Sequence, residues 1–418
     1  MTRDERQAIA KDKWLKSNGI GTLVQPTGCG KTVTALKCLK TVLTAYPNLS
    51  ILIVVPTSTL KDQWKSQLDS WGLGLNAEVE IINTVVKRNN YKADILVLDE
   101  VHRYAASTFL KVFETVSYRF VLGLTATFDR LDGKHEIIAK YCPVVDMITS
   151  TEALANQWVS EYKEYLVLID VDNIEEYQKW NKEFQVHFEY LNFDFNLAMS
   201  LLGPTGFINR AKLRDQRCPN GTEAERKEVF KQITYHATAF MRCIQQRKAF
   251  VNNHPKKLEL TRKIINARPF SKVITFSNNI KMAEAIGIGK VYSGKDTKKK
   301  GRLTMEEFAN GDFQVINTIQ KCNEGMDLKG LSVAVILGLD SSKTKAVQRL
   351  GRIIRKENDK EAEAFNLVIN NTIETKWFEN SHNGANYITI DEEGLDAVLR
   401  GEEPSPYTKK LKDFQFRY

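Results

Sequence analysis

Cysteine is scarce in this sequence, and a long apolar run is missing. The six cysteines among 418 residues include no C-x-x-C pair, which argues against a zinc site and a disulfide framework. Such cysteine usage is typical of a reducing cytoplasm, the compartment we expect. No apolar run approaches the roughly 20 residues of a membrane-spanning helix, and the charged stretch 1–13 lacks the apolar centre of a secretory signal. We therefore expect neither zinc nor a membrane partner, and we expect a monomer.

The length and composition indicate a large folded protein with a basic surface. A chain of 418 residues exceeds one ordinary core, so two or three domains are expected. Hydrophobic residues make up 42% of the chain, enough for packed cores. The formal charge of +9 suits a polyanionic partner, although many basic proteins bind none.

A glycine-containing turn follows the first apolar run of the chain. The run Ile20–Val24 leads into Gln-Pro-Thr-Gly-Cys-Gly-Lys-Thr at residues 25–32, and a helix-compatible stretch comes next. A strand, a turn and a helix start in this order let backbone N–H groups surround phosphate oxygens at the positive end of a helix dipole. The strict phosphate-loop pattern has Gly where this chain has Gln25.

We expect this turn to bind a nucleoside triphosphate. Lys31 would reach the β- and γ-phosphates, and the Thr32 hydroxyl would bind Mg²⁺. The loop residues expected around the phosphates are Thr27, Gly28, Cys29 and Gly30.

Alternating strands and helices follow the turn. Apolar runs at Ser50–Val55, Asp94–Leu98 and Phe120–Leu124 are separated by helical patterns. This alternation is typical of an α/β fold with a doubly wound parallel sheet, whose ligands lie beyond the carboxyl ends of the strands.

Two carboxylates stand at the end of one of these strands. Burial of Asp99 and Glu100 would be costly unless a cation or a proton transfer used them. Asp99 would hold Mg²⁺, and Glu100 would orient and deprotonate an attacking water. Hydroxyls of Thr125 and Thr127 at the next strand end could link His102 to a neighbouring lobe.

These motifs together resemble those of the superfamily 2 helicases. The resemblance is closest to the branch that holds the phage helicase UvsW and the excision-repair DNA helicases, because of the stretch 130–134 (Arg-Leu-Asp-Gly-Lys). It implies that Gln7, on a helix predicted over residues 2–18, recognises adenine. If the chain is phage-encoded, the host cytoplasm is its expected location.

Residues 172–257 interrupt the α/β rhythm. An apolar stripe from Tyr177 to Met199 predicts one long helix, residues 203–221 predict a loop, and a second stripe begins at Val229. We interpret this insert as a helical hairpin, and its aromatic stripe fits a helix seam better than a base-stacking surface.

The insert is basic. It holds 14 Lys and Arg against 10 Asp and Glu, a net charge of +4. A solvated face and a nucleic-acid contact explain this charge equally well. The candidate contacts chosen for the second explanation are Arg210, Lys212, Arg214 and Arg217.

A second α/β pattern occupies residues 258–385. Gly325 and Asp327 fit a turn that brings backbone close to a nucleotide or nucleic acid. Arg352 and Arg355 stand three residues apart on a predicted helix, so both could grip a γ-phosphate. With Gln348 they resemble the last helicase motif.

The resemblance implies two RecA-like lobes, 1–171 and 258–385, that close on ATP and Mg²⁺; the tail 386–418 is unassigned. The expected partner is DNA that is single-stranded, forked or branched. An RNA helicase and a nucleic-acid-binding scaffold with little ATPase activity are the alternatives. The residues expected to hold the strand are Pro56, Thr57, Phe276, Ser277 and Thr318.

Overall fold

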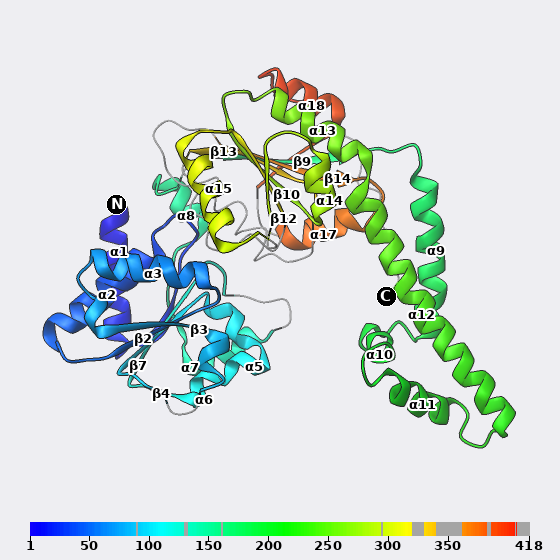
Figure 1. Ribbon diagram of the computed structural model, residues 1–418, viewed down its shortest axis with the longest axis horizontal. Helices are drawn as coiled ribbons and strands as arrows, with labels where there is room; N and C mark the ends of the chain where they lie inside the picture. The colour runs from blue at the N-terminus through cyan, green and yellow to red at the C-terminus, as the bar shows by residue number, and fades with distance from the viewer. Residues whose placement is uncertain are drawn as a thin grey trace.

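The computed structural model describes residues 1–88, 91–128, 133–159, 162–293, 296–319, 330–339, 362–382, 386–405 and 407. Two parallel sheets form the centres of two lobes, and a helical arm extends away from both sheets (Figure 1). The α/β class with two RecA-like lobes and a helical insert is therefore confirmed. None of the helices in the described ranges is long and apolar enough to cross a membrane.

The first sheet has six described strands, all parallel. Their order across the sheet is β3 (Ala77–Ile81), β2 (Ile51–Val55), β5 (Ile95–Asp99), β7 (Phe120–Thr125), β1 (Ile20–Val24) and β8 (Val144–Met147). Strand β2 is buried along its whole length, because helices cover both faces of the sheet. The three strands that end in the predicted motifs, β5, β7 and β1, are neighbours.

Helices fill both faces of the first sheet. One face carries α1 (Arg3–Lys16), α2 (Lys31–Ala45) and α3 (Ser58–Ser70), with Trp14 and Trp64 in the shared core. The other elements of this lobe are η1 (Gly74–Asn76), α4 (Ile82–Val85), β4 (Tyr91–Lys92), η2 (Val101–Ala105), α5 (Ser107–Leu110), α6 (Val112–Thr115), β6 (Val116–Ser117), α7 (His135–Tyr141) and α8 (Ser150–Ala155).

The second sheet has seven described strands, also parallel. Their order is β11 (Lys290–Tyr292), β12 (Val315–Ile319), β10 (Lys272–Ser277), β13 (Leu331–Ile336), β14 (Ala362–Ile369), β9 (Tyr162–Ile169) and β15 (Ile388–Ile390). The described helices of this lobe are α13 (Pro255–Asn266), α14 (Ile280–Ala285), α15 (Lys298–Asn310), α17 (Ile373–His382) and α18 (Glu392–Leu399).

Strand β9 belongs to the second lobe, so the boundary between the lobes lies before Tyr162 and not at residue 171. The sequence pattern assigned residues up to 171 to the first lobe, whereas β9 pairs with β14 over eight residues and with β15 on its other side. Part of the unassigned tail also belongs here, because β15 pairs with β9 and α18 packs Leu395 and Val398 into the core of this lobe. The second lobe is therefore assembled from both sides of the insert.

The arm differs from the expected hairpin in two places. The stripe predicted as one helix is divided between α9 (Ile174–Tyr190) and α10 (Phe195–Ser200). The break lies at Asn192 and Phe193, which have positive φ angles of 56° and 55°, and Asp194 then caps α10. The stretch 203–221, predicted as a loop, contains α11 (Gly206–Arg217) before the long α12 (Glu223–Asn253).

The arm has its own small core. Phe188 of α9 stacks on Phe240 of α12 with ring centroids 5.3 Å apart. Leu201 and Leu213 complete the same cluster from the α10–α11 side. The aromatic stripe is therefore mainly a seam between helices.

The topology predicts which fragments of the chain fold. A fragment of residues 1–159 keeps every described strand of the first sheet, so it should unfold cooperatively on heating. A fragment of residues 172–418 lacks β9, which leaves the partner edges of β14 and β15 unpaired. We expect it to aggregate or to lack a cooperative transition in circular dichroism.

Starting the second fragment at residue 160 is the matched control, since it restores β9 and should restore cooperative unfolding. Equal melting temperatures for the two second-lobe fragments would contradict the assignment of β9.

Candidate functional site

The turn after β1 has the backbone shape of a phosphate loop. Gly28 and Gly30 have φ angles of 94° and 84°, in the left-handed region. Gly30 precedes the first residue of α2, Lys31, so the helix N-terminus opens onto the loop. A Cβ at Gly30 would lie 2.5 Å from Nε2 of Gln7, and the positive φ would strain any other residue, so glycine is favoured there.

Gln25, which replaces the first glycine of the strict pattern, braces the loop. Its side chain is fully buried, and Thr34 of α2 donates to its Oε1 at 3.0 Å. Its backbone N–H donates to Thr125 O at 2.9 Å, which joins the loop to the end of β7. Lys31 Nζ lies 3.4 Å from Gln25 O, folded back on the loop. The departure from the pattern therefore has a structural role.

Helix α1 supports the loop from the other side. Gln7 is 4% exposed, and its Nε2 donates to Cys29 O at 2.9 Å. Arg3 reaches Gly28 O at 3.3 Å. Gln7 thus lies at the loop, as expected, with one amide hydrogen engaged by the loop itself. Burial raises the pKa of the Cys29 thiol to about 11, so Cys29 serves packing rather than thiol chemistry.

Asp99 and Glu100 meet the loop at the end of β5. Asp99 is 6% exposed, and burial together with the adjacent Glu100 raises its pKa to about 6. Trp64 Nε1 donates to Asp99 Oδ2 at 2.8 Å, and the Glu100 N–H donates to Oδ1 at 3.0 Å. Glu100 has a φ of 52°, a strained value that concentrates at functional sites. No sequence motif marks Trp64 as part of the site.

His102 joins the two neighbouring strand ends. Its Nδ1 lies 2.8 Å from the Thr125 hydroxyl and 3.4 Å from Glu100 Oε2. The Thr125 hydroxyl in turn donates to Thr127 O at 2.6 Å. Thr125 therefore contacts His102 within the first lobe, whereas Thr127 takes part through its backbone carbonyl. The expected link from these hydroxyls to a neighbouring lobe stays a prediction.

The expected strand-binding residues are mostly enclosed. Thr57 caps α3 by accepting from the Leu60 N–H, and Pro56 beside it is half-buried. Phe276 and Ser277 are fully buried. The Thr318 hydroxyl donates a hydrogen bond to Thr275 O at 2.8 Å. The predicted nucleic-acid contacts of Phe276, Ser277 and Thr318 remain untested, and the burial of these side chains argues against them.

The four arginines and lysines chosen in the insert divide into two groups. Arg210 donates to Leu201 O at 2.7 Å, and Arg217 donates to Tyr190 O at 2.7 Å, so both hold the arm together. Arg214 pairs with the adjacent Asp215, and Lys212 is exposed. Lys212 and Arg214 are therefore the better candidates for an external partner.

Several expected site residues lie outside the described ranges. They are Gly325, Asp327, Gln348, Arg352 and Arg355.

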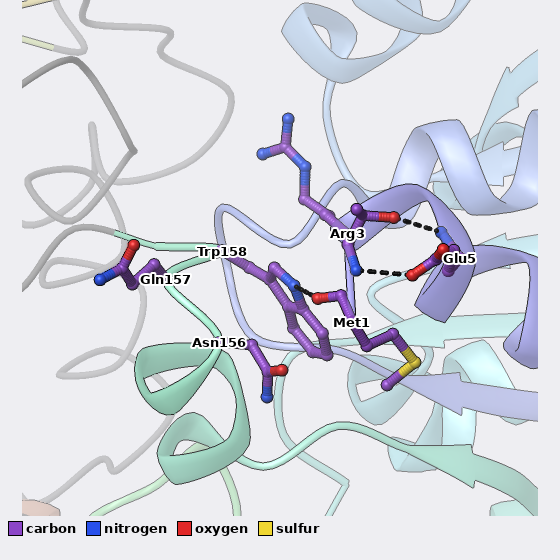
Figure 2. A pocket seen from close by; sticks show the side chains of 7 residues that line it. Met1, Arg3, Glu5, Asn156, Gln157 and Trp158 are labelled. Atoms are coloured by element: carbon purple, nitrogen blue, oxygen red, sulfur yellow. Dashed lines mark hydrogen bonds between the residues drawn. The ribbon is translucent and has the colours of Figure 1, made fainter.

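A cavity of about 510 Å³ lies beside the N-terminal end of α1. It lies between the first turn of α1 and the residues that follow α8, with Arg3 and Glu5 on one side and Asn156 and Trp158 on the other (Figure 2). Trp158 donates its indole N–H to Met1 O at 3.1 Å. No sequence motif marked this cavity, because its walls come from segments about 150 residues apart.

Family models match both lobes. A model described as the res subunit of type III restriction enzymes matches residues 1–94 and 82–130, and the helicase conserved C-terminal domain matches residues 256–357. The chain belongs to the superfamily 2 helicases. The expected enzyme class, an ATP-driven helicase, is thereby confirmed, whereas the UvsW branch stays a prediction.

Two relatives illustrate the range of this family. The DNA 3'-5' translocase XPB2 of Sulfurisphaera tokodaii is 27% identical over 386 residues, which are 88% of this chain and 81% of that protein. The ATP-dependent RNA helicase ROK1 of Lodderomyces elongisporus is 25% identical over 358 residues, 78% of this chain and 53% of that protein. The chain thus spans about half of the second relative.

Solved structures agree on the fold. S. cerevisiae Dbp5 bound to RNA and ADP BeF3 superimposes with a TM-score of 0.59 at 14% identity, covering 94% of this helicase and 91% of that chain. The helicase domain of Pyrococcus furiosus Hef gives 0.50 at 17% identity, covering 91% and 97%. At such identities only the architecture is shared.

Two substitutions should damage the site differently. Lys31→Ala removes a phosphate contact, so it should weaken ATP binding and abolish turnover. Glu100→Gln keeps the volume but cannot accept a proton, so kcat should fall by roughly 10²–10⁴ while ATP still binds. Equilibrium nucleotide binding and steady-state hydrolysis separate the two effects. A wild-type rate in Glu100→Gln would disprove its assignment as the base.

Proposed function

We propose that this helicase hydrolyses ATP at the carboxyl edge of the first sheet and uses the cycle to move along or separate DNA. The observation that carries the proposal is the convergence of three strand ends. The phosphate loop after β1, the Asp99–Glu100 pair at the end of β5 and Thr125 of β7 lie side by side, and His102 contacts both Glu100 and Thr125. Ligands of doubly wound sheets bind at such edges.

The residues at this edge take separate roles in the proposal. Lys31 and the loop N–H groups bind the phosphates, and Gln7 recognises the base. Glu100 positions a water and accepts its proton, while the Trp64 indole fixes the carboxylate of Asp99 beside it. Arg352 and Arg355 would complete the cleft from the second lobe.

The donor set fits Mg²⁺. Thr32 at the start of α2 and Asp99 supply the oxygen ligands that this ion prefers. Among the described residues no group of three or more His, Cys, Asp or Glu could hold a metal ion. The remaining ligands would then be phosphate and water oxygens, the usual arrangement for Mg²⁺ with a nucleotide. When bound, the ion would offset the charge of the phosphates.

DNA is favoured over RNA by the relatives. XPB2, named a DNA translocase, aligns at 27% identity over 88% of this chain, whereas ROK1, named an RNA helicase, aligns at 25% over 78%. We therefore propose forked or branched DNA as the substrate, with single-stranded DNA as the minimal ligand.

An ATPase assay with three polynucleotides tests this proposal. We expect forked and single-stranded DNA to raise the hydrolysis rate at matched nucleotide concentration, with RNA a weaker activator. Glu100→Gln is the control for contaminating ATPases. Stronger stimulation by RNA would favour the RNA helicase, and the absence of hydrolysis would favour the scaffold.

The arm is proposed to touch the nucleic-acid backbone through the exposed Lys212 and the part-buried Arg214, which pairs with Asp215. Lys212→Ala combined with Arg214→Ala should weaken DNA binding and lower the slope of log K against log salt by up to roughly two, because each phosphate contact releases about one counterion. Hydrolysis without DNA should not change. Fluorescence anisotropy across a salt series measures the slope.

The matched control uses the other two arginines of α11. Arg210→Ala combined with Arg217→Ala removes the two carbonyl contacts within the arm, so it should lower the melting temperature. An unchanged salt slope in the Lys212 and Arg214 variant would assign the arm a purely structural role.

A further inference from the structure

Arg6 lies at the centre of a buried ion-pair network that no proposed catalytic step uses. Its side chain is 6% exposed, and Nη1 and Nη2 grip both carboxylate oxygens of the fully enclosed Asp146 at 2.7 and 3.2 Å. Its Nε donates to Glu152 at 2.8 Å, and Nη2 also donates to Met147 O at 2.9 Å. One guanidinium thus ties α1 to both β8 and α8.

Helix α1 contacts the phosphate loop, and α8 precedes the connection to the second lobe. Gln7, the next residue on α1, holds the phosphate loop through Cys29 O. Helix α8 leads through residues 156–159 into β9, which belongs to the second sheet. Cys29 of the loop packs in one cluster with Trp158 of this connection, and Figure 2 shows Trp158 against the start of α1.

We infer that Arg6 is a positioning residue that couples the phosphate loop to the connection between the lobes. The inference rests on the proposed ATPase function. A shift of the loop on nucleotide binding must move Gln7 and α1, or be resisted by them. Because Arg6 bonds Glu152, the displacement would also reach α8. This helix precedes residues 156–159, which lead to β9 of the second lobe. A planar guanidinium can hold two partners in fixed directions, which a lysine ammonium cannot.

The two carboxylates allow the two functions of Arg6 to be separated. Asp146 is fully enclosed and anchors the guanidinium to β8, whereas the Glu152 side chain is 30% exposed and can be removed at small cost to stability. Glu152→Ala therefore breaks only the link to α8. Arg6→Lys loses the fork on Asp146 as well as that link.

ATPase kinetics with and without single-stranded DNA test the coupling. Glu152→Ala should leave the KM for ATP and the DNA-independent rate unchanged, but lower the stimulation by DNA at least fivefold, within the range of ordinary coupling between sites. Arg6→Lys should also raise the KM for ATP on the order of tenfold, because Gln7 and the loop lose their support. Melting temperatures are recorded for each variant.

Two exposed neighbours are the matched controls. Lys13→Ala removes the lysine that also pairs with Asp146; the Lys13 side chain is 51% exposed. Thr151→Ala truncates an exposed residue of α8. Both should behave as wild type. If Glu152→Ala keeps full stimulation, the coupling role is overturned, whatever the stability of Arg6→Lys. If the wild-type protein itself lacks DNA-stimulated hydrolysis, the proposed function fails instead.

Discussion

Parallel strand pairing is the constraint on which the candidate site depends. In a parallel sheet covered on both faces, strand interiors must be apolar, so polar chemistry is confined to the strand ends. The carboxyl ends of β1, β5 and β7 then bring Gln25, Asp99 and Thr125 to one edge, although they are dispersed over about 100 residues of sequence. Burial at this edge raises the pKa of Asp99, and the Trp64 indole N–H compensates part of the desolvation.

The sequence was sufficient for the parts of the site that local order determines. A strand, a glycine turn and a helix start are consecutive in the chain, so the phosphate loop could be predicted from residues 20–44 alone. Asp99 and Glu100 follow directly from their strand. Gln7 is different: its place at the loop came only from the family resemblance, since a glutamine on a helix has no local signal. Its contact with Cys29 O is what the structure adds.

Features that depend on remote pairing could not be predicted in this way. The run Tyr162–Ile169 is apolar enough for a strand, but its partner β14 lies about 200 residues later, and sequence order favours the nearer sheet. Trp64 contacts Asp99 across 35 residues, a pairing that helical periodicity cannot reveal. The helix break at Asn192 and Phe193 also lacked a signal, because neither glycine nor proline occupies it and the apolar spacing continues through it.

The attachment of the arm follows from the same strand-end geometry in the second lobe. Asn253, at the end of α12, accepts from Asn279 at 2.7 Å, just beyond β10. Tyr177 of α9 accepts from the Ile373 N–H at 2.9 Å, just beyond β14. Between these points the fully buried Lys257 bonds both oxygens of Glu374 and Leu337 O. Breaking such a pair would leave an uncompensated buried charge. The described contacts therefore attach the arm helices α9 and α12 to the carboxyl ends of β10 and β14, the edge of the second sheet where ligands would bind.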